Sequence, residues 1–79
     1  MTPQDEEKLQ RIFQAVFKLA PGTDLSAVRP NQTPQWDSLG HVTLVAALES
    51  EFNVNLDMAD ALRINSLEVA REVLEQHGV

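Results

Sequence analysis

The sequence predicts an all-α fold of three main helices and one short helix, with a long first loop. Three segments carry apolar residues at the i, i+3, i+4 and i+7 spacings of a helix. A residue that can cap a helix precedes each of them. No stretch alternates apolar and polar residues in the way a half-buried strand does. The length of 79 residues suffices for one small domain, which we assign to residues 1–79.

The first helix is predicted to begin at Pro3 and to end before Pro21-Gly22. Thr2 can cap it, and Asp5 stands where a capping box places its carboxylate. Its buried stripe is expected to consist of Leu9, Ile12, Phe13, Val16, Phe17 and Ala20.

The segment from Pro21 to Trp36 shows neither a helical nor a strand period, and it contains three prolines and one glycine. A connection of this length is uncommon in a compact domain and tends to be functional. We expect Leu25, Val28 and Trp36 to anchor it on the core.

The second helix is predicted from about Ser38 to Phe52, with Asp37 as its cap. At about 100° per residue, its apolar side chains fall on two sides. The core side is expected to hold Leu44, Val45, Leu48 and Phe52. The opposite side holds Leu39, Val42 and Ala46, together with Thr43, Glu49 and Ser50. A helix that is apolar on two sides is either central to the fold or offers an apolar strip to a partner.

The remaining residues predict a short helical turn and a last helix. The turn is expected at Met58–Leu62, and Asn65-Ser66-Leu67-Glu68 indicates a capping box that opens the last helix. His77 and Gly78 are expected to end that helix. Its buried stripe is predicted to be Leu67, Ala70, Val73 and Leu74.

Composition excludes several classes of function. The absence of cysteine excludes disulfides, thiolate metal sites and cysteine nucleophiles. The net charge of −6 disfavours nucleic acid as a partner, and it either suits basic proteins or serves solubility alone. The acidic amino terminus and the lack of a long apolar run predict a cytoplasmic protein that does not insert into membranes. We also expect the protein to be a monomer.

No catalytic or metal-binding constellation is present in the sequence. His41 and His77 lie far apart, so we expect a half-exposed residue and a helix-terminal residue. Asp57 and Asp60 do not complete a calcium loop. Ser38 has no G-x-S-x-G elbow and no obvious base beside it. The sequence therefore predicts no metal site, no catalytic residue and no enzymatic activity.

The segment Trp36-Asp37-Ser38-Leu39-Gly40-His41 is similar to a known site. A serine at the start of a helix is usually only a capping residue, but here the whole layout resembles the acyl carrier protein family. The family's hallmark is Asp-Ser-Leu at the start of the second of four helices, and Asp37-Ser38-Leu39 matches it. The three-residue motif alone recurs by chance, so the resemblance depends on motif, element order, size and acidity together. It covers essentially the whole chain and continues through Leu44-Val45, Ala47-Leu48-Glu49, Glu51-Phe52 and Ile64.

The resemblance implies a stand-alone carrier with a four-helix bundle of the acyl carrier type. A phosphopantetheinyl transferase would attach 4′-phosphopantetheine from coenzyme A to Ser38, and Asp37 would help to hold the metal-bound coenzyme A. A helix amino terminus suits the phosphodiester of such an arm. An acyl- or aminoacyl-loading enzyme would form a thioester on the arm, and a downstream synthase or transferase would use it, as in fatty acid or polyketide biosynthesis.

Two surfaces follow from the same resemblance. Partners are expected to contact a recognition face made of Leu39, Val42, Thr43, Ala46, Glu49 and Ser50. The cargo is expected in a cleft between the second and third helices, with walls made of Ala47, Leu48, Ala61, Leu62 and Ile64.

Departures from the family pattern leave alternatives open. Fatty-acid members have a strongly acidic second helix, whereas Glu49 is the clear acid of this face and Arg63 adds a positive charge. This favours a carrier dedicated to one pathway. An aminoacyl or peptidyl carrier is the second hypothesis, although Gln35-Trp36-Asp37 does not match the Gly-Gly-x-Ser-Leu pattern of that class. The third is a helical protein-interaction module with an unmodified Ser38.

Overall fold

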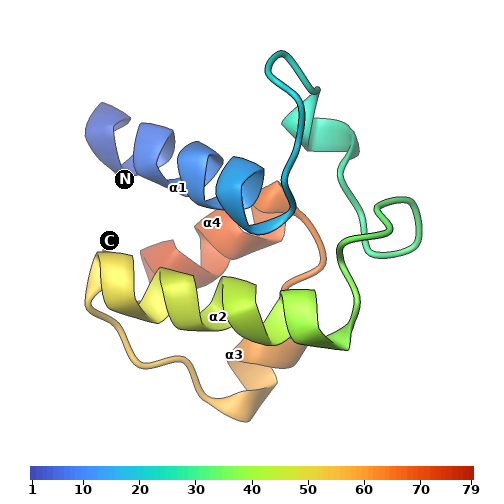
Figure 1. Ribbon diagram of the computed structural model, residues 1–79. Helices are drawn as coiled ribbons and strands as arrows, with labels where there is room; N and C mark the ends of the chain where they lie inside the picture. Colours follow the sequence, from blue (N-terminus) through green and yellow to red (C-terminus); the bar gives the residue numbers. More distant parts are fainter.

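The computed structural model describes residues 1–79 and contains four α-helices, one 3₁₀ helix and no strand. The all-α class is therefore confirmed. None of the helices combines the length and the apolar character that crossing a membrane requires. In chain order the elements are α1 (Pro3–Val16), η1 (Leu25–Ala27), α2 (Ser38–Phe52), α3 (Met58–Arg63) and α4 (Leu67–Gln76) (Figure 1).

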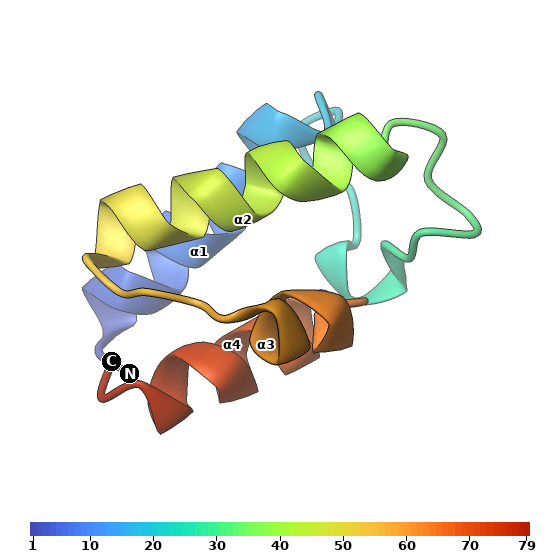
Figure 2. The ribbon, with the colours of Figure 1, turned by 90° about the horizontal axis from the view of Figure 1, so that it is seen from below.

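Helix α1 occupies the centre of the packing. It packs against both α2 and α4, and η1 packs on α4 (Figures 1 and 2). The short α3 lies beside α4 on the side of the molecule away from α1. Both views place the two ends of the chain close together, and the amino-terminal ammonium of Met1 lies 3.7 Å from Glu75 Oε2.

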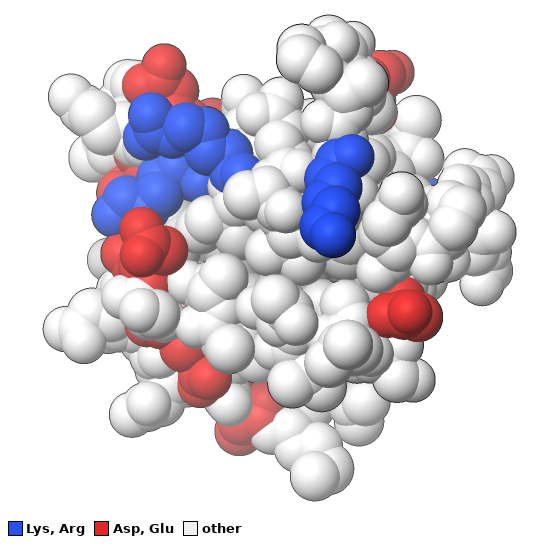
Figure 3. Space-filling model, viewed as in Figure 1, with Lys and Arg blue, Asp and Glu red and all other residues white.

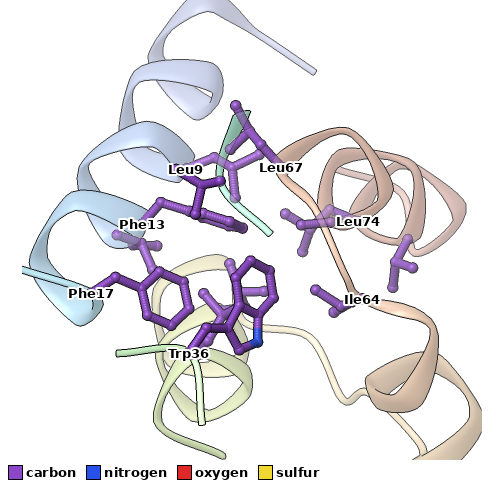
Figure 4. Packing of buried hydrophobic residues seen from close by; sticks show 13 residues of the cluster. Leu9, Phe13, Phe17, Trp36, Ile64, Leu67 and Leu74 are labelled. Carbon is purple, nitrogen blue, oxygen red and sulfur yellow. The ribbon is translucent and has the colours of Figure 1, made fainter. Parts of the chain in front are cut away.

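The core is one cluster of buried apolar side chains, with three aromatic rings at one end (Figure 4). Phe17 stacks on Trp36 with ring centroids 4.6 Å apart, and Phe13 meets both rings edge-on at 5.7 Å. Trp36 thereby fixes the end of the first loop on α1. The cluster consists of Leu9, Ile12, Phe13, Phe17, Val28, Trp36, Leu44, Leu48, Ile64, Leu67, Ala70, Val73 and Leu74.

The carboxyl end of α1 differs from the prediction. The helix ends at Val16, four residues before Pro21-Gly22 is reached. Lys18 adopts the left-handed conformation with φ 52°, and the amide of Leu19 donates to Gln14 O over 3.0 Å. This is the hydrogen bond of a Schellman motif, which closes a helix without proline. Phe17 is still buried as predicted, whereas Ala20 lies outside the helix and is exposed.

The long first loop is folded onto the core. Val28 and Trp36 are buried and Leu25 is partly buried, which confirms all three predicted anchors. The loop also contains the 3₁₀ turn η1, although no helical turn was expected in this segment. Asp24 caps this turn by accepting from the amide and the hydroxyl of Ser26. These hydrogen bonds lower the pKa of Asp24.

Helices α2 and α4 agree closely with the predictions. Helix α2 has the predicted bounds and the predicted cap, and all four residues of the expected α4 stripe are buried. The opening of α4 differs in one detail. Ser66 is the cap and accepts from the amide of Val69, so Glu68 stands one position too early to complete a capping box.

Helix α3 has no buried residue. Two polar contacts join it to the end of α4. His77 Nε2 donates to Asp60 Oδ2 over 2.8 Å, and Arg63 donates to Gln76 Oε1 over 3.0 Å. The hydrogen bond from His77 lowers the pKa of Asp60. Hydrogen bonds, rather than apolar burial, therefore place this helix.

An ion pair joins the first helix to the last. Arg71 donates to both carboxylate oxygens of Glu6, one of them from Nε over 2.9 Å. Each side chain retains 30% of its exposure. The guanidinium lowers the pKa of Glu6 from its usual value of 4.5, chiefly through the side-chain hydrogen bond.

Glu6→Gln should destabilise the protein by about 0.5–1 kcal/mol near neutral pH, because a two-pronged but partly solvated pair is lost. Because the pKa of Glu6 is lower in the folded than in the unfolded state, the ion pair contributes its full stability above pH 4.5. This contribution is lost as the pH falls through the folded-state pKa. Urea unfolding should therefore show a difference in stability between wild type and variant that narrows as the pH falls below 4.5. The exposed Glu7→Gln is the control, with little effect at either pH. A gap that persists in acid, or an equal loss in the control, would contradict the assignment.

Candidate functional site

Ser38 is the first residue of α2, and its side chain is exposed. Asp37 caps the helix by accepting the amide of Gly40 through Oδ1 over 2.8 Å. The amides of Ser38 and Leu39 have no acceptor within the chain, as expected for the first turn of a helix. The partial positive charge of these amides favours an anionic group at this point.

The loop passes directly against the first turn of α2 at Gly40. A Cβ atom added to Gly40 would lie 2.2 Å from Gln35 O and 3.3 Å from Asp37 Oδ1. Real Cβ atoms do not approach a backbone oxygen so closely, so only glycine fits here. Gly40 thereby lets the chain turn tightly into the helix and presents Ser38 outward.

Trp36, His41 and Ala61 form a hydrogen-bonded chain beside this turn, which we call the His41 bridge. Trp36 Nε1 donates to His41 Nδ1 over 3.0 Å, and His41 Nε2 lies 2.7 Å from Ala61 O. The indole can only donate, so Nδ1 must accept and Nε2 must carry the proton that Ala61 O receives. The bridge therefore requires the neutral Nε2–H tautomer of His41.

A hollow of about 430 Å³ opens next to Ser38, which we call the Ser38 hollow. One side is formed by the end of the first loop and the first turn of α2, and the other by the end of α3 and the turn into α4. Its lining residues are Pro30, Trp36, Asp37, Ser38, His41, Leu62, Ile64 and Asn65.

A second, smaller space of about 220 Å³ lies between α2 and α3, which we call the α2–α3 groove. Its lining is mainly apolar: His41, Val42, Val45, Ala46, Glu49 and Ala61. The five residues predicted as cleft walls are thus separated. Leu62 and Ile64 line the Ser38 hollow and Ala61 lines the groove. Ala47 and Leu48 line neither, since Leu48 is fully buried and Ala47 packs on the core.

The six residues predicted as a recognition face lie together along α2, and all but the half-buried Glu49 are exposed. Leu39 is 75% exposed and Val42 is 64% exposed. Thr43 donates its hydroxyl to Leu39 O, and Glu49 Oε2 accepts the amide of Leu56. Two polar side chains of this face, Thr43 and Glu49, are therefore already hydrogen-bonded within the chain. Figure 3 shows a mostly uncharged surface over the region where Figure 1 places α2.

His41 was expected to be only a half-exposed residue without a role, whereas in the structure it joins the loop to α3. The only available signal was its position one turn into α2, five residues after a buried tryptophan whose N–H needs an acceptor. Pro30 and Asn65, which also line the Ser38 hollow, carried no signal.

No group of three or more histidine, aspartate or glutamate side chains converges to hold a metal ion. Comparison of the chain with protein-family models, with curated proteins and with solved structures gave no match.

Gly40→Ala tests the close approach that shapes the turn. Overpacking costs about 1–3 kcal/mol, and the better helix propensity of alanine offsets about 1 kcal/mol of that. Because the backbone oxygen would lie only 2.2 Å from the added Cβ, the cost falls at the upper end of this range, so we expect a net loss of about 2 kcal/mol in urea unfolding, together with altered fluorescence of Trp36. Ser50→Ala, at an exposed position of the same helix, should not destabilise the protein. An equally stable Gly40→Ala would show that the loop does not constrain this turn.

Proposed function

We propose that this chain is an acyl carrier protein that bears a 4′-phosphopantetheine arm on Ser38 and has no catalytic activity of its own. The observation that carries the proposal is the setting of this serine. Its hydroxyl is exposed at the first position of α2, directly after the capping Asp37 and beside two free backbone amides. The Asp-Ser-Leu motif at the head of the second helix is the feature by which the chain resembles the carrier family.

The residues around Ser38 fit a phosphodiester. The amides of Ser38 and Leu39 can donate to its oxygens, and the amino end of α2 favours its negative charge. Asp37 uses Oδ1 for the cap, which leaves Oδ2 for the hydrated metal ion of bound coenzyme A. The thiol at the end of the arm would supply the thioester linkage that a chain without cysteine cannot form itself.

Ser38 takes the role of nucleophile in the attachment. Its Oγ forms a bond to the phosphorus that joins pantetheine to the nucleotide part of coenzyme A. The bond from this phosphorus to the nucleotide breaks, 3′,5′-ADP leaves, and the serine proton passes to a base of the transferase. No basic side chain of this chain accepts a hydrogen bond from the Ser38 hydroxyl, and both ring nitrogens of the nearby His41 are bonded elsewhere, which agrees with a substrate of the transferase rather than with an enzyme.

Intact mass after incubation with coenzyme A and a promiscuous phosphopantetheinyl transferase tests the proposal. The wild-type chain should gain one phosphopantetheine, and Ser38→Ala should gain none while keeping its helicity. Ser26→Ala removes another exposed serine, which lies outside the recognition face, and should still be modified. An unmodified wild type would refute the carrier function and favour an interaction module. A modified Ser38→Ala would refute the site.

The recognition face is proposed to bind partners mainly through apolar contact. Its small and apolar members are free, whereas Thr43 and Glu49 are bonded within the chain. Central apolar positions dominate such interfaces, and rim charges chiefly alter association rates.

Ala46→Arg should therefore lower kcat/KM for arm transfer by roughly tenfold, equivalent to ~1.4 kcal/mol. Glu49→Gln keeps an oxygen that can accept the Leu56 amide, so it should change kcat/KM far less. Gln4→Arg adds the same charge at the start of α1, far from Ser38, and serves as the control. The reverse order of Ala46→Arg and Glu49→Gln would mean that electrostatic attraction dominates recognition.

A further inference from the structure

The side chain of His41 separates two spaces that both adjoin α2. It lines the Ser38 hollow on one side and the α2–α3 groove on the other. Both ring nitrogens are bonded, one to the buried Trp36 and the other to the backbone of α3. The ring is also nearly parallel to the indole, with an interplanar angle of 20° and centroids 6.2 Å apart. The imidazole is therefore held in place from two directions.

The bond from His41 to Ala61 is the only hydrogen bond between α2 and α3. The contacts of Asp60 and Arg63 join α3 to α4, and Glu49 holds the loop that precedes α3. No residue of α3 is buried, so little apolar burial opposes its movement away from α2. The imidazole of His41 is therefore the only hydrogen-bonded link between α3 and the helix that bears Ser38, whereas the other contacts of α3 lead to α4.

We propose that His41 is a positioning residue that holds α3 against α2 and so keeps the Ser38 hollow separate from the α2–α3 groove. Leu62 follows Ala61 directly and lines the hollow, so it moves when the bond to Ala61 opens. The two spaces then join along α2. The part of this inference that concerns an arm on Ser38 rests on the proposed function. The holding of α3 is a property of the unmodified chain.

Two substitutions divide the His41 bridge into its halves. Asparagine places its Oδ1 near the position of Nδ1, so His41→Asn can still accept from Trp36 but cannot reach Ala61. Glutamine is about as long as the imidazole, so the amide nitrogen of His41→Gln can still donate to Ala61 O. His41→Phe keeps a ring against the indole and makes neither hydrogen bond.

Hydrogen exchange of the unmodified chain, followed by NMR, measures the opening of α3. One neutral hydrogen bond corresponds to roughly a fivefold change in an opening equilibrium. In His41→Asn and His41→Phe, the amides of Ala61 and Ile64 should exchange roughly fivefold to tenfold faster, and the Leu62 methyl signals should shift. In His41→Gln, the exchange rates of these two amides should stay within about twofold of their wild-type values. The indole N–H of Trp36 should lose protection in His41→Phe but keep it in His41→Asn.

The outcomes separate this inference from the carrier proposal. Equal exchange of the α3 amides in His41→Asn, His41→Gln and wild type would overturn the role of His41, whatever happens at Ser38. Faster exchange in His41→Gln equal to that in His41→Asn would also overturn it, because rescue by the conservative variant would be absent. A chain that accepts no arm on Ser38 would refute the carrier function and leave the exchange result valid.

Discussion

The burial of Trp36 joins the core of this protein to its Ser38 site. The indole stacks on Phe17, and a buried indole N–H needs an acceptor. His41 provides that acceptor from the first turns of α2 and donates a hydrogen bond from Nε2 to the backbone of α3. Because Trp36 directly precedes Asp37 and Ser38, its stacking also fixes where α2 begins. The side chain of Trp36 therefore fixes the position of the end of the loop and of Ser38. Through His41 it also contributes to the position of α3.

Two kinds of interaction hold the four helices. Helices α1, α2 and α4 share the buried apolar cluster, and burial of that kind contributes about 25 cal/mol for each Å² removed from water. Helix α3 depends on hydrogen bonds, each with a net contribution of about 1 kcal/mol. Local opening of α3 therefore costs much less than unfolding of the core. Ser38 stands on a firmly packed helix, whereas Leu62, on the opposite wall of the hollow, stands on the least firmly held one.

The sequence predicted the features that depend on local pattern and failed on those that depend on tertiary position. The bounds of α2 follow from the Asp37 cap, and the α4 stripe follows from helical spacing. The predicted end of α1 was wrong for two reasons. Phe17 continues the apolar spacing past the last residue of the helix, and the left-handed conformation of Lys18 has no sequence signal comparable to that of a glycine. The partition of the predicted cleft depends on the side-chain direction of His41, which spacing along a helix cannot specify.

The distribution of charge and apolar surface explains how so acidic a chain could bind through a face that carries only one charged residue, Glu49. The net charge of −6 acts over a distance of about one Debye length and can accelerate the approach of a basic partner. Contact itself would involve Leu39 and Val42, which are exposed although the fold does not need them at the surface. Because the Thr43 hydroxyl and one carboxylate oxygen of Glu49 already have bonds within the chain, a partner displaces water from fewer free polar atoms on this face. Long-range charge would then set the association rate, and the apolar strip beside Ser38 would set the affinity.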